Sequence, residues 1–262
     1  MSKQYHTPLV HRTLPEWVEM MREGEPFVQV GYSDAEWYCI LGNQIGETTG
    51  LGQVITAEQG QLLSGIIKRR HDDHRWHFAM PEALWNGEVS NTEGDKVGQY
   101  LASVLDIRDL TIYERDIFTD YAARDALLCP LIAFLRKARL SPIFIGPEPL
   151  RSLDLDIAGP IFHHTISTPN LHQHPEEIDD LMEEFSLMDY SDSRIVLVSA
   201  GVSAAVIIDR LYERFPQHTY FDCGSIWDAF VGIGGQRQWR ADLYADPEKL
   251  QAWKDKNCGN ES

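Results

Sequence analysis

The sequence lacks several features that would place it in a common class of protein. Its four cysteines are scattered, and no C-x-x-C pair occurs, which excludes a zinc ribbon and a thioredoxin-like motif and predicts free thiols. The longest weakly polar run, residues 195–208, is too short to span a bilayer. The first 17 residues contain no apolar stretch of the kind found in signal peptides. We therefore expect a cytoplasmic protein with no membrane partner.

Basic residues are also scarce, with 23 Lys and Arg against 40 Asp and Glu and a net charge of −17. Such a surface on average repels nucleic acid and anionic membranes. The acidity is uneven, because residues 152–193 contain no Lys or Arg. One local run is positive and contains Lys68, Arg69, Arg70 and Arg75. The charge disfavours a general nucleic-acid binder but leaves one basic cleft open.

What the sequence does contain is ordinary globular composition. It has 262 residues, 43% hydrophobic and 24% charged, which is enough to bury a full core. No repeat, low-complexity tract or long linker divides it. We predict a single compact domain over residues 1–253 and a flexible tail over 254–262. A homo-oligomer is left open.

Strand and helix patterns alternate along the chain. The predicted strands are short apolar or alternating segments: 27–30, 143–146, 162–167, 194–199 and 219–222. The predicted helices begin after Thr13, at Asp34, after Thr56, after Pro175 and at Val202. This order is typical of βαβ units. It predicts an α/β fold with a Rossmann-like, mostly parallel sheet, helices on both faces, and ligands beyond the carboxyl ends of the strands.

The candidate binding residues follow the predicted strands. A small-residue turn after strand 194–199 opens a helix, where backbone N–H groups suit a diphosphate, although a plain strand-to-helix turn capped by Ser203 is an equal alternative. Neither a dinucleotide fingerprint nor a P-loop is present. The candidates are Ser199, Gly201, Val202 and Ser203 in this turn, Asp222, Gly224, Ser225 and Asp228 after the next strand, and Gly146 and Glu148 after another.

Asp34 and Glu36 directly follow the first strong strand. If the chain stays extended there, both carboxylates lie on one face and suit Mn²⁺ or Mg²⁺ with substrate phosphates. If Asp34 is already helical, the two side chains diverge by about 200° and cannot share a metal. Ser33 and Glu36 also have capping-box spacing, and on the residues alone this cap is the favoured interpretation.

Two arginines offer a further anion contact. Arg237 and Arg240 flank Trp239 after a glycine-rich stretch. They are placed to clamp a phosphate bidentately, or they are ordinary surface arginines.

At this point the sequence resembles a known family. Residues 27–42 resemble the N-terminal motif of GT-D-type glycosyltransferases, in which Gly-Asp-Gly-Glu gives the D-x-E signature. Residues 195–228 are similar to the second half of that family. Two departures stand out, since Gly31 replaces the usual arginine, and Ser33 and Ala35 replace the usual glycines. Short, stand-alone relatives of this type look phage-like, which would place the protein in a host cytoplasm.

The resemblance implies a nucleotide-diphosphate sugar donor and a divalent metal, Mn²⁺ or Mg²⁺, near D-x-E. Carried over, Asp34 and Glu36 form the metal and diphosphate site. Asp228 is the candidate general base. The donor contacts are Gly31, Tyr32, Ser33, Gly146, Glu148, Ser199, Gly201, Val202, Ser203, Asp222, Gly224, Ser225, Arg237 and Arg240.

The acceptor has two alternatives. One is the hydroxyl of a glycan. The other is a hydroxymethylated pyrimidine in DNA, with Lys68, Arg69, Arg70 and Arg75 steering the duplex and the base extruded. A non-catalytic nucleotide-sugar-binding module remains a rival class, whereas a methyltransferase would need a glycine-rich first turn that is absent here.

Overall fold

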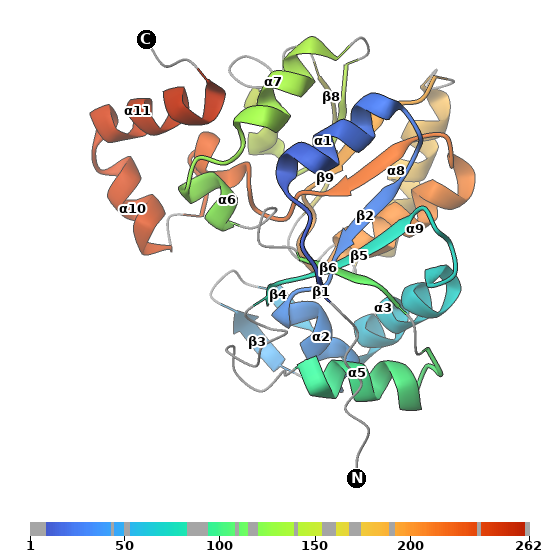
Figure 1. Cartoon of the computed structure of the whole chain (residues 1–262). Helices are drawn as coiled ribbons and strands as arrows, with labels where there is room; N and C mark the ends of the chain where they lie inside the picture. The colour runs from blue at the N-terminus through green and yellow to red at the C-terminus, as the bar shows by residue number, and fades with distance from the viewer. Residues whose placement is uncertain are drawn as a thin grey trace.

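An eight-stranded, all-parallel sheet forms the centre of the molecule (Figure 1). The computed structural model describes residues 9–42, 45–49, 53–82, 94–107, 110–114, 120–138, 141–153, 161–167, 174–188, 192–234 and 237–259. The strand order is β1-β6-β5-β2-β10-β9-β7-β8. The strands are β1 (Leu9–Val10), β2 (Val28–Gly31), β5 (Trp76–Met80), β6 (Ile112–Glu114), β7 (Ile143–Gly146), β8 (Phe162–Thr165), β9 (Ile195–Val198) and β10 (Thr219–Asp222).

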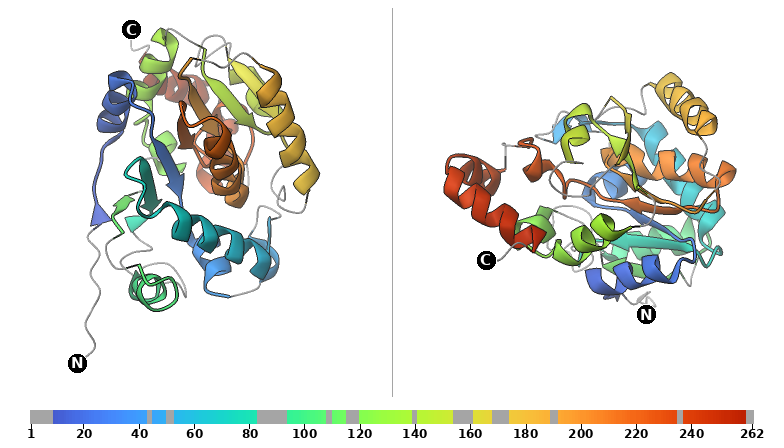
Figure 2. Two further views of the ribbon diagram at one scale, coloured as in Figure 1. Left: turned by 90° about the vertical axis from the view of Figure 1, so that its right-hand side faces the viewer. Right: turned by 90° about the horizontal axis from the view of Figure 1, so that it is seen from above.

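Helices cover both faces of this sheet, as the two turned views show (Figure 2). They are α1 (Leu14–Glu23), α2 (Asp34–Ile40), α3 (Ala57–Arg70), α5 (Gly94–Ser103), α6 (Asp120–Arg124), α7 (Cys129–Lys137), α8 (Pro175–Leu187), α9 (Ala204–Arg214), α10 (Gln238–Tyr244) and α11 (Pro247–Cys258). Short 3₁₀ turns are η2 (Glu148–Ser152), η5 (Gly201–Ser203) and η6 (Asp228–Phe230). A small antiparallel hairpin, β3 (Ile45–Thr49) and β4 (Gln53–Ile55), joins α2 to α3.

Successive strand residues enter two separate cores. Val28 and Val30 pack with α3, α5, α8 and α9, whereas Phe27 packs with α1 and α7 on the opposite face. This follows from the alternation of side chains along a strand, and burial on both faces explains the nearly continuous apolar runs of β7 and β9. The predicted α/β class and its parallel sheet are therefore confirmed.

A strand and the C-terminal segment are among the parts of the architecture that differ from the sequence-based expectation. The central strand β5 was not predicted, because its buried residues follow a stretch rich in Arg, His and Asp. Residues 254–258, predicted as part of a flexible tail, form the last turns of α11. Asn257 is fully buried there, and its side-chain amide donates to the carbonyl of Ala123 at 3.2 Å.

No helix in the described part of the chain has both the length and the apolar character needed to cross a membrane.

Candidate functional site

The carboxyl edge of the sheet collects most of the residues singled out from the sequence. The strands β2, β10, β9 and β7 are successive neighbours in the sheet, and all four run in the same direction. Their following segments therefore lie next to one another: Ser33 and Asp34 after β2, Cys223–Ser225 after β10, Ser199–Ser203 after β9, and Pro147 and Glu148 after β7. The predicted residues are therefore adjacent in space, and the contacts of each side chain determine whether it can bind a ligand.

Asp34 and Glu36 do not lie side by side. The helix α2 begins at Asp34, so the extended conformation is not the one adopted. Glu36 is buried, and its Oε2 accepts the backbone N–H of Ser33 at 2.7 Å, which is the capping box. Because two residues on a helix are rotated by about 200°, the carboxylates point apart. The predicted metal site shared by Asp34 and Glu36 is therefore not formed in this structure.

Asp34 itself is exposed at the first position of the helix. Within the described residues its carboxylate has no hydrogen-bond or ion-pair partner. It is thus the acid of the motif that remains open to a ligand at the strand ends.

Asp222 connects two strands instead of facing a ligand. Its side chain is 2% exposed. Oδ2 accepts the N–H of Gly31 at 2.9 Å, and Oδ1 accepts the N–H of Gly224 at 3.0 Å. These bonds hold the end of β2 against the end of β10. Gly31 and Asp222 were predicted to contact the sugar donor, but in the structure they are hydrogen-bonded to each other and support the site from within the sheet.

Tyr32 is also part of the framework. Its ring is buried against Trp37 and Phe78, and its hydroxyl donates to the carbonyl of Leu63 at 3.1 Å. This contact fixes the turn before α2 to the neighbouring helix α3. The predicted contact between Tyr32 and a donor is not supported by this orientation.

Asp228 and Arg240 form an ion pair behind the end of β10. Arg240 is 1% exposed, and its Nη1 donates to Asp228 Oδ2 at 2.9 Å while Nη2 donates to the carbonyl of Ser225 at 3.0 Å. A carboxylate so engaged is a poor general base, and a guanidinium whose Nη atoms already donate to Asp228 and Ser225 is a poor ligand for an incoming phosphate. The predicted roles of Asp228 and Arg240 are therefore corrected. Arg237 lies half-buried just before α10.

The turn after β9 keeps the features of an anion site. Gly201 has a φ of +54°, and η5 leads directly into the eleven-residue helix α9. The side chain of Ser203 is fully buried, and in the described part of the chain its hydroxyl has no hydrogen-bond partner. Buried hydroxyls are normally paired, so this one is a candidate contact for a bound oxygen. Ser199 is 7% exposed beside it.

The end of β7 is closely packed against this turn. A Cβ on Gly146 would lie 2.7 Å from Leu150 Cδ1 and 3.3 Å from the carbonyl oxygen of Ser199. Glu148 is exposed, and its Oε2 accepts the hydroxyl of Thr165 at 2.7 Å and lies 3.4 Å from Arg151 Nη2. Glu148 is thus paired toward β8, away from β9.

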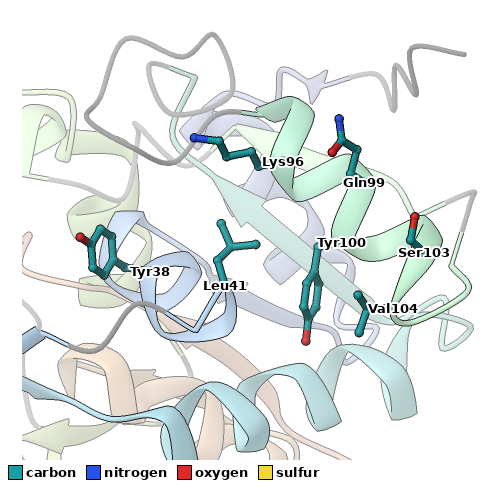
Figure 3. Close-up of a pocket in the computed structure, with 7 residues that line it drawn as sticks. All are labelled: Tyr38, Leu41, Lys96, Gln99, Tyr100, Ser103 and Val104. Atoms are coloured by element: carbon teal, nitrogen blue, oxygen red, sulfur yellow. The ribbon is translucent and has the colours of Figure 1, made fainter. Parts of the chain in front are cut away.

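A cavity of about 600 Å³ lies between α2 and α5, one helical turn along from Asp34 (Figure 3). Tyr38 and Leu41 form its α2 side, and the α5 side carries Lys96, Gln99, Tyr100, Ser103 and Val104. The hydroxyls of Tyr100 and Ser64 are 2.9 Å apart and link α5 to α3. These lining residues were not predicted from the sequence. They lie on or directly after two helices that are far apart in the sequence and meet only by tertiary packing, so no local pattern indicates them.

A second group missed from the sequence lies at the β1, β5 and β6 end of the same edge. It contains His11, Glu82 and Glu114, whose ligand atoms all lie within 4.8 Å of one another. The available signal was that each residue lies at or just after the end of a strand, but β1, β5 and β6 were themselves not predicted.

The basic run lies at the opposite edge. The helix α3 ends at Arg70, and the chain then enters β5 at its amino end. Asp209 accepts from Arg69 at 2.6 Å and from Arg70 at 2.7 Å, and Arg75 lies 3.5 Å from Asp73. Lys68 is exposed on α3. The three arginines of this run are thus paired with acids at the edge opposite the strand ends, and its role in steering DNA stays a prediction.

Comparison with known proteins finds likeness only at the level of structure. No family model matches the chain, and no curated protein sequence matches it. Two similar solved structures each superimpose with a TM-score of 0.58, and their sequences are 16% and 17% identical to this one. Each alignment covers 86% of this chain and 81% of the other chain. One is a selenomethionine-substituted structure of domain of unknown function 1792, and the other is of the same domain, described as having a distinct glycosyltransferase fold. The chain shares that fold.

Proposed function

We propose that the protein is a glycosyltransferase that moves a sugar from a nucleotide-diphosphate donor to an acceptor hydroxyl. The observation that carries this proposal is the set of polar residues at the strand ends along one edge of the sheet. The protein shares its fold with a solved structure that is described as having a glycosyltransferase fold. Ligands of parallel α/β sheets bind at this edge. The same edge carries an exposed acid, Asp34, and a buried hydroxyl, Ser203, that has no partner among the described residues.

The donor diphosphate is assigned to the turn after β9. The backbone N–H groups at the start of α9 carry partial positive charge and suit the oxygens of a leaving diphosphate. The hydroxyl of Ser203 would supply one further hydrogen bond to them. Preorganised donors of this kind stabilise charge that develops as the bond between the sugar and the diphosphate breaks.

The acceptor side is assigned to Asp34. The acceptor oxygen forms a bond to the anomeric carbon, the diphosphate leaves with the bonding electron pair, and the hydroxyl proton passes to a base. Asp222 is hydrogen-bonded to backbone and Asp228 to Arg240, while Glu36 caps α2. Asp34 is the carboxylate of this group that stays open, so it is the proposed proton acceptor. Asp34 and Glu36 point apart on α2 and do not fit one shared metal ion.

The acceptor is proposed to be a glycan hydroxyl. The pairing of Arg69, Arg70 and Arg75 with Asp209 and Asp73 at the far edge weakens the case for duplex DNA as the acceptor. The cavity beside Tyr38 is placed to receive an acceptor sugar, since aromatic rings and polar side chains together form its wall.

A non-catalytic module that binds nucleotide sugars is the second candidate. The engagement of Glu36 and Asp228 favours it, because two of the three predicted catalytic carboxylates have framework partners. Such a module would bind the donor at the turn after β9 and release no nucleotide.

Nucleotide release from a panel of nucleotide-diphosphate sugars, with Mn²⁺ and with simple glycan acceptors, separates the two candidates. We expect Asp34→Asn to reduce turnover at least about 100-fold, the range of general-base catalysis. Its melting temperature should not change, because the side chain is exposed and unpaired within the described residues. Asp180→Asn, an exposed acid on α8, is the matched control.

Donor binding by the wild type without any release would favour the binding module. Equal turnover by wild type and Asp34→Asn would show that Asp34 is not the base.

A further inference from the structure

Three potential metal ligands converge from three different strands. His11 directly follows β1, Glu114 is the last residue of β6, and Glu82 comes two residues after β5. The strands are neighbours in the sheet, with Leu9 opposite Ile112 and Met80 opposite Glu114. The position of the group is therefore fixed by the sheet and not by a single loop.

The distances suit one ion. His11 Nδ1 and Glu114 Oε2 are 2.7 Å apart, and one ligand atom from each of the three residues lies within 4.8 Å of the other two. Atoms that bind a single ion at about 2.1 Å lie at most about 4.2 Å from one another. A closure of less than about 1 Å would bring all three to one centre.

The local charge also favours a cation. Glu82 has no hydrogen-bond or ion-pair partner among the described residues, and its carboxylate and that of Glu114 both lie close to the imidazole of His11. The nearby guanidinium of Arg12 lies over the rings of Trp17 and Tyr113, at 4.6 and 4.7 Å from their centroids. Its Nη1 donates to the sulfur of Met20 at 2.9 Å. The carboxylates of Glu82 and Glu114 therefore face the imidazole of His11, while the nearby Arg12 contacts other side chains.

We propose that His11, Glu82 and Glu114 bind a divalent transition metal ion. The mixture of imidazole nitrogen and carboxylate oxygen favours Mn²⁺ or Zn²⁺ over Mg²⁺ or Ca²⁺, which prefer oxygen alone. His11 is 60% and Glu114 18% exposed on their side chains, so an ion can enter from solvent. The remaining coordination positions would hold water or a ligand oxygen.

This site differs from the one expected at D-x-E. It uses neither Asp34 nor Glu36, and it lies beyond β5, the neighbour of β2. The binding claim does not depend on the proposed glycosyl transfer. Its structural consequence is a tie between the sheet and β1, a strand of two residues.

Calorimetric titration with Mn²⁺ or Zn²⁺, and the electron paramagnetic resonance signal of free Mn²⁺, test the site. We expect one ion per chain, bound at least about 10-fold more weakly by His11→Ala and by Glu82→Gln. His174→Ala is the matched control, because His174 lies 3.3 Å from Glu176 but belongs to no group of three potential ligands among the described residues. Unchanged melting temperatures of the apo variants would exclude unfolding as the cause.

Wild-type affinity in both His11→Ala and Glu82→Gln, or no saturable binding of either ion by the wild type, would overturn the proposal. Asp34→Asn separates it from the proposed function, since that variant should lose turnover and keep the ion. Loss of the ion in Asp34→Asn, with His11→Ala unaffected, would place the metal at D-x-E instead.

Discussion

At the scale of single residues, the acids at one sheet edge differ in whether their carboxylates accept hydrogen bonds from backbone N–H groups. Glu36 accepts the N–H of Ser33, and Asp222 accepts those of Gly31 and Gly224. Asp34 has no such bond in the described part of the chain. A carboxylate that accepts hydrogen bonds from unpaired backbone N–H groups at a helix or strand end stabilises the fold, whereas a carboxylate that points outward can contact a ligand.

His77 gives a prediction at the same scale. It is buried on β5 against Trp17 and Tyr113, and burial, with a smaller contribution from Arg12, lowers its pKa to about 4. The unfolded chain then binds more protons than the folded one between pH 6.5 and about 4, so the stability from neutral His77 is lost as the pH falls through that range. The loss reaches about 3 kcal/mol at most.

Urea denaturation at pH 7 and at pH 5 checks this. His77→Leu should lose less stability than the wild type between the two values, and His174→Gln, exposed before α8, should behave like the wild type. An identical pH dependence for His77→Leu would show that His77 does not titrate with unfolding. His218, whose pKa burial also lowers to about 4, acts in the same direction in every variant.

At the scale of elements, the contact between α2 and α3 sets where Asp34 lies. A Cβ on Gly60 would collide with the carbonyl of Cys39, so the two helices approach at a point where only glycine fits. The hydroxyl of Tyr32 reaches α3 beside this contact. The position of the D-x-E helix is therefore determined by its neighbour as much as by its own cap.

Gly60→Ala and Gly65→Ala, both within α3, test that contact. Gly60→Ala should destabilise the protein by roughly 2 kcal/mol or more, because backbone must move to admit the methyl group. At Gly65 the nearest atom is the flexible end of Arg69, at 3.2 Å, so alanine should be neutral or stabilise by up to about 1 kcal/mol through helix propensity. Denaturant midpoints measure both, and equal values for the two variants would contradict close packing at Gly60.

At the scale of the whole molecule, the two faces of the sheet carry separate cores, and the last helices extend the one that contains α1 and α7. In Figure 1, α10 and α11 lie to the side of the sheet beyond α6. Trp253 on α11 donates from Nε1 to the carbonyl of Ala123 at 2.7 Å, and its ring lies 4.5 Å from that of Phe230. The C-terminal segment thus covers the helix that follows β6.

Truncation of the C-terminal segment measures how much its packing contributes to stability. Removing residues 247–262 should lower the melting temperature by about 5–10 °C, because the packing of Trp253 and the buried bonds of Asn257 are lost. Removing only 260–262 leaves α11 complete and should have no effect. A full α11 deletion that melts like the wild type would mean that the helix contributes nothing to stability.

The sequence by itself determined the local features of this protein. The apolar runs of β7, β9 and β10 predict buried parallel strands, and the spacing of Ser33 and Glu36 predicts the cap that the structure has, because both depend on residues close together in the chain. Tertiary structure alone decided which acids stay open and which groups meet. Asp228 finds Arg240 twelve residues away across a turn, and Asp222 finds Gly31 across 191 residues, while His11, Glu82 and Glu114 meet only because β1, β6 and β5 are neighbours. Strand order follows from the packing of the whole sheet, which no short pattern encodes.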